Sequence, residues 1–183
     1  MVIMVIGVIA VLIVLYVIAS YNGFIKLRNK SEEAFSAMDV TLKKRYDLIP
    51  NIVETVKGYA KHEKSTLESV INARNNAVSS STPEDVIKND NLLSGTLRSL
   101  FALSENYPDL KANTNFLELQ QQLSRIEDEI SASRRYYNAV VNAFNTKLEV
   151  FPGSIIAGIF NFVRKPLYVV SDDKERENVK VSF

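Results

Sequence analysis

The chain has 183 residues, about the length of one domain. Its 22 Lys and Arg balance 21 Asp and Glu to a net charge of +1, which argues against a nucleic-acid-binding protein, because such proteins concentrate positive charge on one surface. The absence of cysteine and the presence of a single histidine exclude a disulfide framework, a thiol nucleophile and a zinc site of the Cys/His type.

The first 21 residues predict a transmembrane helix. They carry no charged side chain, and thirteen of the first twenty are Leu, Ile or Val, which favours insertion by about 4–8 kcal/mol. A cleaved signal peptide is the alternative, but it has a basic start and an apolar run of about 7–15 residues. Here no Lys or Arg precedes a longer run. We therefore expect a retained anchor, residues 1–21, with Tyr21 as an interfacial aromatic residue.

The charges that flank this span predict its orientation. Lys26, Arg28 and Lys30 follow the span, and only the α-amino group precedes it. Positively charged segments stay on the cytoplasmic side of a membrane. We expect a single-pass protein of a bacterial cell membrane, with its N-terminus outside and its C-terminal domain in the cytoplasm.

Residues 22–163 predict an all-α domain, an antiparallel up-and-down four-helix bundle. Apolar residues recur at helical spacing over 22–46, 50–79 and 83–106. The longest stripe has steps of three and four and is typical of a bundle or coiled-coil seam; it comprises Phe116, Leu119, Leu123, Ile126, Ile130, Ser133, Tyr137, Val140, Phe144, Leu148 and Phe151. A short C-terminal helix at 154–163 follows, and the charged tail 164–183 is expected to be flexible.

Pro50 leaves two alternatives for the first two bundle helices. A proline can kink one continuous helix. A rod over 22–79 would then be about 87 Å long, against about 60 Å for its longest partner, and apolar side chains would stay exposed. A turn near Asp47 gives helices of about 38 and 45 Å and buries more, so we favour the turn. Further along, Thr82 is expected to cap a helix that begins at Pro83.

The helix at 154–163 is a candidate membrane-interface element. In up-and-down order the fourth helix returns toward the bilayer, and an apolar helix that ends in basic residues, here Arg164 and Lys165, can lie in the interface. The candidate interface residues are Tyr21, Ile155, Ile156, Ile159, Phe160 and Phe162. The alternative, which we favour, is that this helix packs across the end of the bundle as part of its core.

Several long strings resemble the LemA family. The most specific runs without a gap over 38–60, and others lie at 105–113, 134–138 and 179–183. Asn161 stands where a glycine is common in that family. The resemblance covers nearly the whole chain. It implies a single-pass bacterial membrane protein with a cytoplasmic helical bundle and no established enzymatic reaction.

The sequence predicts no catalytic, cofactor-binding or metal site. A di-iron bundle needs two Glu-x-x-His motifs on facing helices, which the single His62 cannot supply. Glu127, Asp128 and Glu129 are adjacent in the sequence, so they spread around a helix and cannot converge. An enzyme with a pocket at the end of the bundle is therefore the third reading, and converging carboxylates with a strongly shifted pKa would mark it.

Two segments are candidate partner-binding sites. Lys43, Lys44 and Arg45 form a basic run about 32 Å along a helix from residue 22, which is too far for lipid and suits a protein partner or another copy of the chain. A solvated helix end explains the same run more simply. Val181 and Phe183 belong to an alternating stretch that can add to a partner as a strand or enter a pocket that binds a terminal carboxylate.

Asparagines at helical spacing provide a structural hypothesis. Asn138, Asn142 and Asn145 on the fourth helix, and Asn22 and Asn29 on the first, can form buried polar layers that fix the register of helices. The sequence supports equally well the alternative that these side chains are exposed to solvent.

The leading functional hypothesis is a membrane-anchored scaffold or interaction protein without a catalytic site. Its expected partners are the lipid bilayer and unidentified proteins, with self-association as one form, and no nucleic acid. The second hypothesis is a membrane-remodelling module that uses the anchor together with the helix at 154–163.

Overall fold

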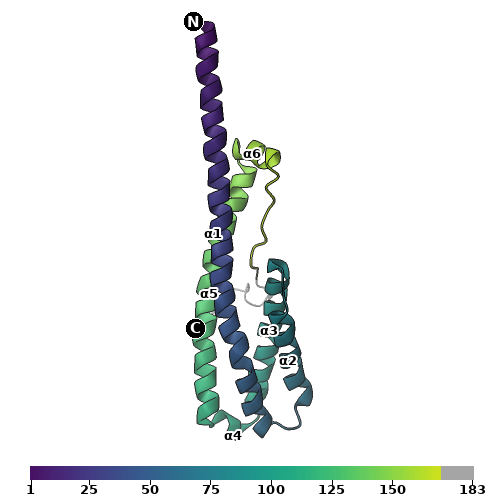
Figure 1. Ribbon diagram of the computed structural model, residues 1–183. Coiled ribbons are helices and arrows are strands. Elements are labelled where there is room, and N and C mark those ends of the chain that lie inside the picture. Colours follow the sequence, from purple (N-terminus) through teal and green to yellow (C-terminus); the bar gives the residue numbers. More distant parts are fainter. Residues whose placement is uncertain (170–183) are drawn as a thin grey trace, which may run out of the picture. The chain divides into compact units, whose positions relative to one another are not determined.

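The structure, a computed structural model, describes residues 1–169 (Figure 1). These residues contain helices and no strand, which confirms the all-α class. The helices are α1 (Val2–Tyr59), α2 (Lys64–Val78), α3 (Pro83–Ser104), α4 (Pro108–Lys111), α5 (Thr114–Glu149) and α6 (Gly153–Ile159). Val181 and Phe183, the candidate partner-binding residues near the C-terminus, lie outside the described residues.

The chain divides into two compact units. Unit 1 consists of Met1–Thr41 and Asp128–Leu167. Unit 2 consists of Leu42–Glu127 and, among the described residues, Tyr168 and Val169. The helices α1 and α5 each contribute residues to both units.

In unit 1, α1 and α5 run antiparallel. The ring of Phe24 lies 6.2 Å from that of Phe144, and the ring of Phe35 lies 5.7 Å from that of Tyr137, so numbers that rise along α1 meet numbers that fall along α5. Phe24 and Phe144 form a core cluster with Ile156 and Ala157 of α6. The apolar stripe predicted along α5 is buried or half-buried up to Leu148, whereas Phe151, its last member, is 80% exposed.

The helix α6 ends because Asn161 adopts a left-handed backbone conformation. This residue has φ 54°, in the left-handed region that glycine and asparagine tolerate best. The N–H of Phe162 donates to the oxygen of Ala157 at 3.0 Å, and the N–H of Asn161 donates to the oxygen of Gly158 at 3.4 Å. Together these bonds form a Schellman motif, which satisfies carbonyl groups at the helix end.

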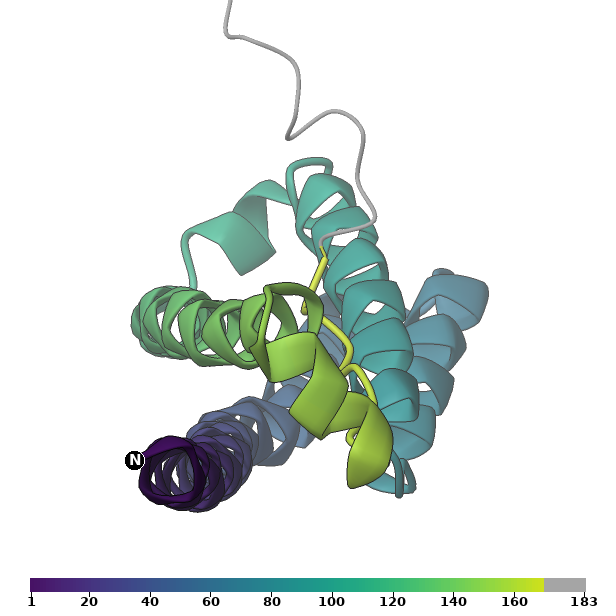
Figure 2. The same ribbon diagram turned by 90° about the horizontal axis from the view of Figure 1, so that it is seen from above.

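An extended segment follows α6, drawn in yellow in Figure 2. Asn145 of α5 holds it with two hydrogen bonds: its amide donates to the oxygen of Lys165 at 2.9 Å and accepts from the N–H of Lys165 at 3.0 Å. The Tyr137 hydroxyl donates to the oxygen of Pro166 at 2.9 Å. The expected flexible tail therefore does not include residues 165–166, because α5 binds their backbone.

Burial, which the asparagine hypothesis requires, is found at Asn145 and in part at Asn138, which is half-buried. Asn145 is buried, with 3% of its surface exposed, and it binds backbone rather than another asparagine. Asn142, Asn22 and Asn29 are exposed, so the predicted polar layers are wrong at these positions. The buried amide suits this position because it supplies both a donor and an acceptor to the backbone of one residue, Lys165.

In unit 2, α2 and α3 pack side by side as an antiparallel hairpin (Figures 1 and 2). The predicted cap of α3 is confirmed: the Thr82 hydroxyl accepts from the N–H of Asp85 at 3.1 Å, and Pro83 occupies the first helical position. Asn89 ties the two helices by donating to the oxygen of Asn76 and to the Ser80 hydroxyl. Apolar residues at helical spacing fill the interior, among them Val70, Ala73, Ala77, Leu93, Leu97 and Leu100.

The predicted turn near Asp47 is wrong, because α1 continues through Pro50 to Tyr59. The first break falls instead at 60–63, before α2. Proline removes the N–H that would bond to the oxygen of Tyr46. In the structure the Arg74 Nε–H of α2 donates to that oxygen at 3.2 Å, so a side chain replaces the missing backbone donor and the helix can continue.

Candidate functional sites

The N-terminal part of α1 has the composition of a membrane span. It is the one helix among the described residues that is long and apolar enough to cross a bilayer. From Met1 to Tyr16 every residue is exposed, although almost all are Val, Ile, Leu or Met. A contiguous apolar surface of this size marks an interaction site, and for a helix it favours lipid. This helix indicates a membrane location.

The candidate interface residues on and after α6 differ in exposure. Ile156 is buried in the core of unit 1, with 4% exposed, so its assignment to the membrane interface is wrong. Phe162 is half-buried and stacks on Phe24 with ring centroids 4.8 Å apart. Ile155, Ile159 and Phe160 are exposed. The helix α6 therefore packs into the core of unit 1 with one face, as in the favoured alternative, and exposes apolar side chains on its other face.

Tyr21 connects the apolar span to α6. Its half-buried ring lies 4.7 Å from the ring of Phe160 and 5.9 Å from that of Phe162. Val17, one turn earlier on α1, packs against the core cluster that contains Phe24 and Ile156. The residues that follow α6 thus lie beside the last turn of the apolar span.

Lys147 is held at the same level of unit 1. Its ammonium group lies 4.7 Å from the centre of the Phe24 ring and donates to the oxygen of Ser20 at 3.2 Å. Burial lowers the pKa of Lys147 below its ordinary value of 10.5, because the charged form loses hydration. The cation–π contact and the carbonyl oxygen compensate part of that loss.

The basic run Lys43–Lys44–Arg45 is not one surface. Lys43 and Lys44 are exposed, and their partner-binding role stays a prediction. Arg45 is fully buried, with 0% exposed, so its assignment to a partner-binding surface is wrong in this conformation. The reason is the helical period: Arg45 lies three residues after Leu42 and four before Ile49, on the buried face of α1.

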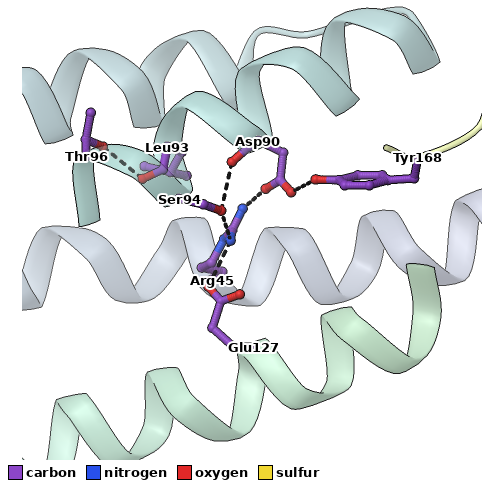
Figure 3. Close-up of polar contacts among 7 residues, drawn as sticks. All are labelled: Arg45, Asp90, Leu93, Ser94, Thr96, Glu127 and Tyr168. Carbon is purple, nitrogen blue, oxygen red and sulfur yellow. Dashed lines mark hydrogen bonds and ion pairs between the residues drawn. The ribbon is translucent and has the colours of Figure 1, made fainter. Parts of the chain in front are cut away.

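Arg45 is the centre of a buried charge cluster in unit 2 (Figure 3). Its Nη1 donates to Glu127 Oε1 at 2.8 Å and to Ser94 Oγ at 3.1 Å, and its Nη2 pairs with Asp90. The Tyr168 hydroxyl donates to the other oxygen of Asp90. One guanidinium group thus joins α1, α3 and α5, and Asp90 joins Tyr168 to them.

The arrangement of this cluster favours a structural role. Arg45 and Asp90 are both 0% exposed, so no substrate reaches them, and each charge is compensated by the other. Removing one partner of such a pair leaves a buried charge and is strongly destabilising. Sequence reasoning missed Asp90, although a signal was present: it occupies the apolar face of α3 between Val86 and Leu93.

A groove lies between the end of α1 and α2 in unit 2. The hypothesis of an enzyme would require converging carboxylates in such a groove. The volume of this groove is about 700 Å³, and its lining residues are Val53, Glu54, Lys57, Gly58, Lys61, Lys64, Leu67, Glu68 and Ile71. Its two carboxylates are exposed, and each pairs with a lysine of the groove: Glu54 with Lys57 and Glu68 with Lys64. Residues 1–169 also contain no group of three His, Cys, Asp or Glu placed to hold a metal.

Residues 34–183 match the LemA family, and the chain belongs to that family. It is 27% identical over 165 residues to Protein LemA of Metamycoplasma hominis, covering 88% of this chain and 74% of that protein. It is also 24% identical over 190 residues to Magnetosome protein MamQ 2 of Paramagnetospirillum magneticum, covering 90% of this chain and 69% of that protein.

Proposed function

We propose that this LemA-family chain is a single-pass membrane protein that binds other proteins through its helical surfaces and has no catalytic site of its own. The observation that carries the proposal is the contrast along α1. Its first sixteen residues expose apolar side chains to the surroundings, whereas residues from Phe24 onward alternate buried and exposed positions as in a water-soluble helical protein.

The orientation follows from charge. Lys26, Arg28 and Lys30 are exposed just after the span and favour the cytoplasmic side, with the N-terminus outside. The chain has no cysteine, so single cysteines can report this topology. In intact cells, a membrane-impermeant maleimide should label Val2→Cys and should label Lys88→Cys only after permeabilisation. The reverse pattern would contradict the orientation, and release of the protein from washed membranes would contradict the anchor.

The proposed partner surface includes Lys43, an exposed cation on α1. Crosslinking in native membranes followed by mass spectrometry identifies neighbours and shows whether copies of the chain lie together. Lys43→Glu should reduce the yield of the crosslinked partner. Lys88→Glu, the same charge reversal at an exposed position of α3, is the control and should leave the yield unchanged. Equal effects of the two variants on the crosslinking yield would show that Lys43 is not part of the binding surface.

The relatives named MamQ are magnetosome proteins by name, and they supply no reaction for this chain. Turnover of a substrate by the purified protein, abolished by one polar substitution, would refute the non-enzymatic part of the proposal.

A further inference from the structure

The outer face of α6 and its two flanks form a surface without charge. From Val150 to Val163 there are fourteen residues with no Lys, Arg, Asp or Glu, and this stretch is called the apolar hairpin below. Its exposed apolar side chains are Val150, Phe151, Ile155, Ile159, Phe160 and Val163, and the last of these is 75% exposed. This is an apolar patch with nothing in unit 1 to cover it.

The apolar hairpin is fixed in position rather than free to move away from α1. Ile156 and Ala157 on its inner face are buried against Phe24 and Phe144. Phe160 and Phe162 pack on Tyr21, at the end of the apolar span. Phe160 therefore lies beside Tyr21, and the packing of Ile156 and Ala157 on Phe24 ties the depth of the hairpin in a bilayer to the depth of α1.

The charges around the hairpin indicate how it meets lipid. Arg164 pairs with Glu149, and Lys165 pairs with Glu32 at 3.2 Å. The basic residues that follow α6 are thus compensated within unit 1, and the exposed cations nearest to the membrane are those of α1, Lys26, Arg28 and Lys30. The hairpin itself carries no charge, so its own insertion should depend on buried apolar area and little on anionic lipid.

We infer that the apolar hairpin, residues 150–163, inserts into the bilayer leaflet that borders residues 17–24 of α1. This inference rests on the proposed membrane anchor and extends it: the chain contacts one leaflet through two elements, a spanning helix and a shallow hairpin. The occupant of the exposed face is lipid because the face continues the apolar surface of the span without a charged residue between Tyr21 and its ring partners on the hairpin.

The test uses the absence of tryptophan from the chain. Full-length Ile159→Trp, Tyr136→Trp and Ile9→Trp variants each carry one tryptophan and are reconstituted in phosphatidylcholine vesicles with brominated acyl chains. Tyr136 is an exposed residue of α5 about 21 Å along the helix from Val150, and it is the control on the water-facing side. Circular dichroism verifies that each variant folds.

The expected result is a blue-shifted emission at position 159, quenched more by shallow than by deep bromines and unchanged by anionic lipid or by 1 M salt (~3 Å screening length). Position 136 should stay unquenched. If position 9 is quenched and 159 is not, the hairpin inference fails and the anchor stands. If 159 and 136 are quenched alike, α6 has no specific insertion and the inference fails. If position 9 is not quenched, the membrane anchor fails, and the hairpin inference fails with it.

Discussion

The side chain of Arg74 on α2 supplies the hydrogen bond that Pro50 denies to the backbone oxygen of Tyr46 on α1. The helices α1 and α2 are separated by a break at 60–63, so the hydrogen bond between Arg74 and Tyr46 is a tertiary contact. It allows a proline inside a helix of 58 residues.

Removing this donor should destabilise the protein in a way that depends on Pro50. We expect Arg74→Met to lower the free energy of unfolding by about 1–3 kcal/mol, because the oxygen of the buried Tyr46 loses its partner. In a Pro50→Ala background the new N–H of residue 50 bonds to that oxygen, and the cost should fall below about 1 kcal/mol. Denaturation in detergent, followed by circular dichroism at 222 nm, measures both costs. Equal costs in the two backgrounds would contradict the compensation.

The buried charge cluster gives the largest expected loss. Arg45→Met should lower the free energy of unfolding by about 3–5 kcal/mol, because it leaves Asp90 charged and buried without its partner. Lys43→Met, two residues earlier on the exposed face of α1, is the matched control and should stay within about 0.5 kcal/mol of the wild type. A similar loss for the two variants would show that Arg45 is not buried as described. Replacing Arg45 and Asp90 together by apolar residues should recover part of the loss.

Two glycines of α6 should respond in opposite directions to alanine. A Cβ at Gly153 would lie 2.5 Å from the backbone oxygen of Lys147, so Gly153→Ala forces α6 away from the end of α5 and should cost about 1–3 kcal/mol. A Cβ at Gly158 meets no atom within 4 Å, so Gly158→Ala should gain about 0.5–1 kcal/mol from helix propensity. The same denaturation assay compares them. A neutral Gly153→Ala would mean that α6 does not approach α5 this closely.

The pair of Tyr107 and Glu63 in unit 2 predicts a shifted titration. Burial raises the pKa of Tyr107 above 10.0, and the hydrogen bond from its hydroxyl to Glu63 Oε1 at 3.1 Å and the charge of Glu63 raise it further. Because the folded-state pKa is raised, the stability that this tyrosine contributes is complete below pH 10.0 and is lost as the pH rises through the folded-state pKa.

Absorbance at 295 nm, compared with Tyr107→Phe, isolates this hydroxyl among the tyrosines. Glu63→Gln should lower the pKa of Tyr107 toward 10.0 without reaching it, because burial is the larger cause. Glu68→Gln changes a neighbouring exposed carboxylate on α2 and should leave the titration of Tyr107 unchanged. A Glu63→Gln titration identical to that of the wild type would contradict the contact.

The sequence predicted the features that depend on local pattern. The apolar span, the cap of α3 at Thr82 and the buried stripe of α5 follow from composition and helical period, and the structure has each of them. The predicted turn near Asp47 is absent because Arg74, 28 positions further along the chain, supplies the donor for the oxygen of Tyr46, and no local pattern shows that contact.

The sites were harder to predict for the same reason. Arg45 was grouped with its exposed neighbours, although its position on the helical period already placed it inside. Its partners Asp90 and Glu127 lie 45 and 82 positions further along the chain, and no local pattern joins them. Ile156 and Ile155 differ in exposure only because α6 packs on Phe24, which depends on the tertiary fold.

The contacts of Tyr168 and its neighbour give the C-terminal part of the chain a fixed starting point. Tyr168 is bound to Asp90, and the oxygen of Val169 accepts from the amide of Asn91 at 3.0 Å, so both residues are tied to the middle of α3. Two consecutive residues, the last ones that the structure describes, are therefore held on one helix, one through its side chain and the other through its backbone. A change that shifts α3 at Asp90 and Asn91 should shift the backbone at Val169 with it.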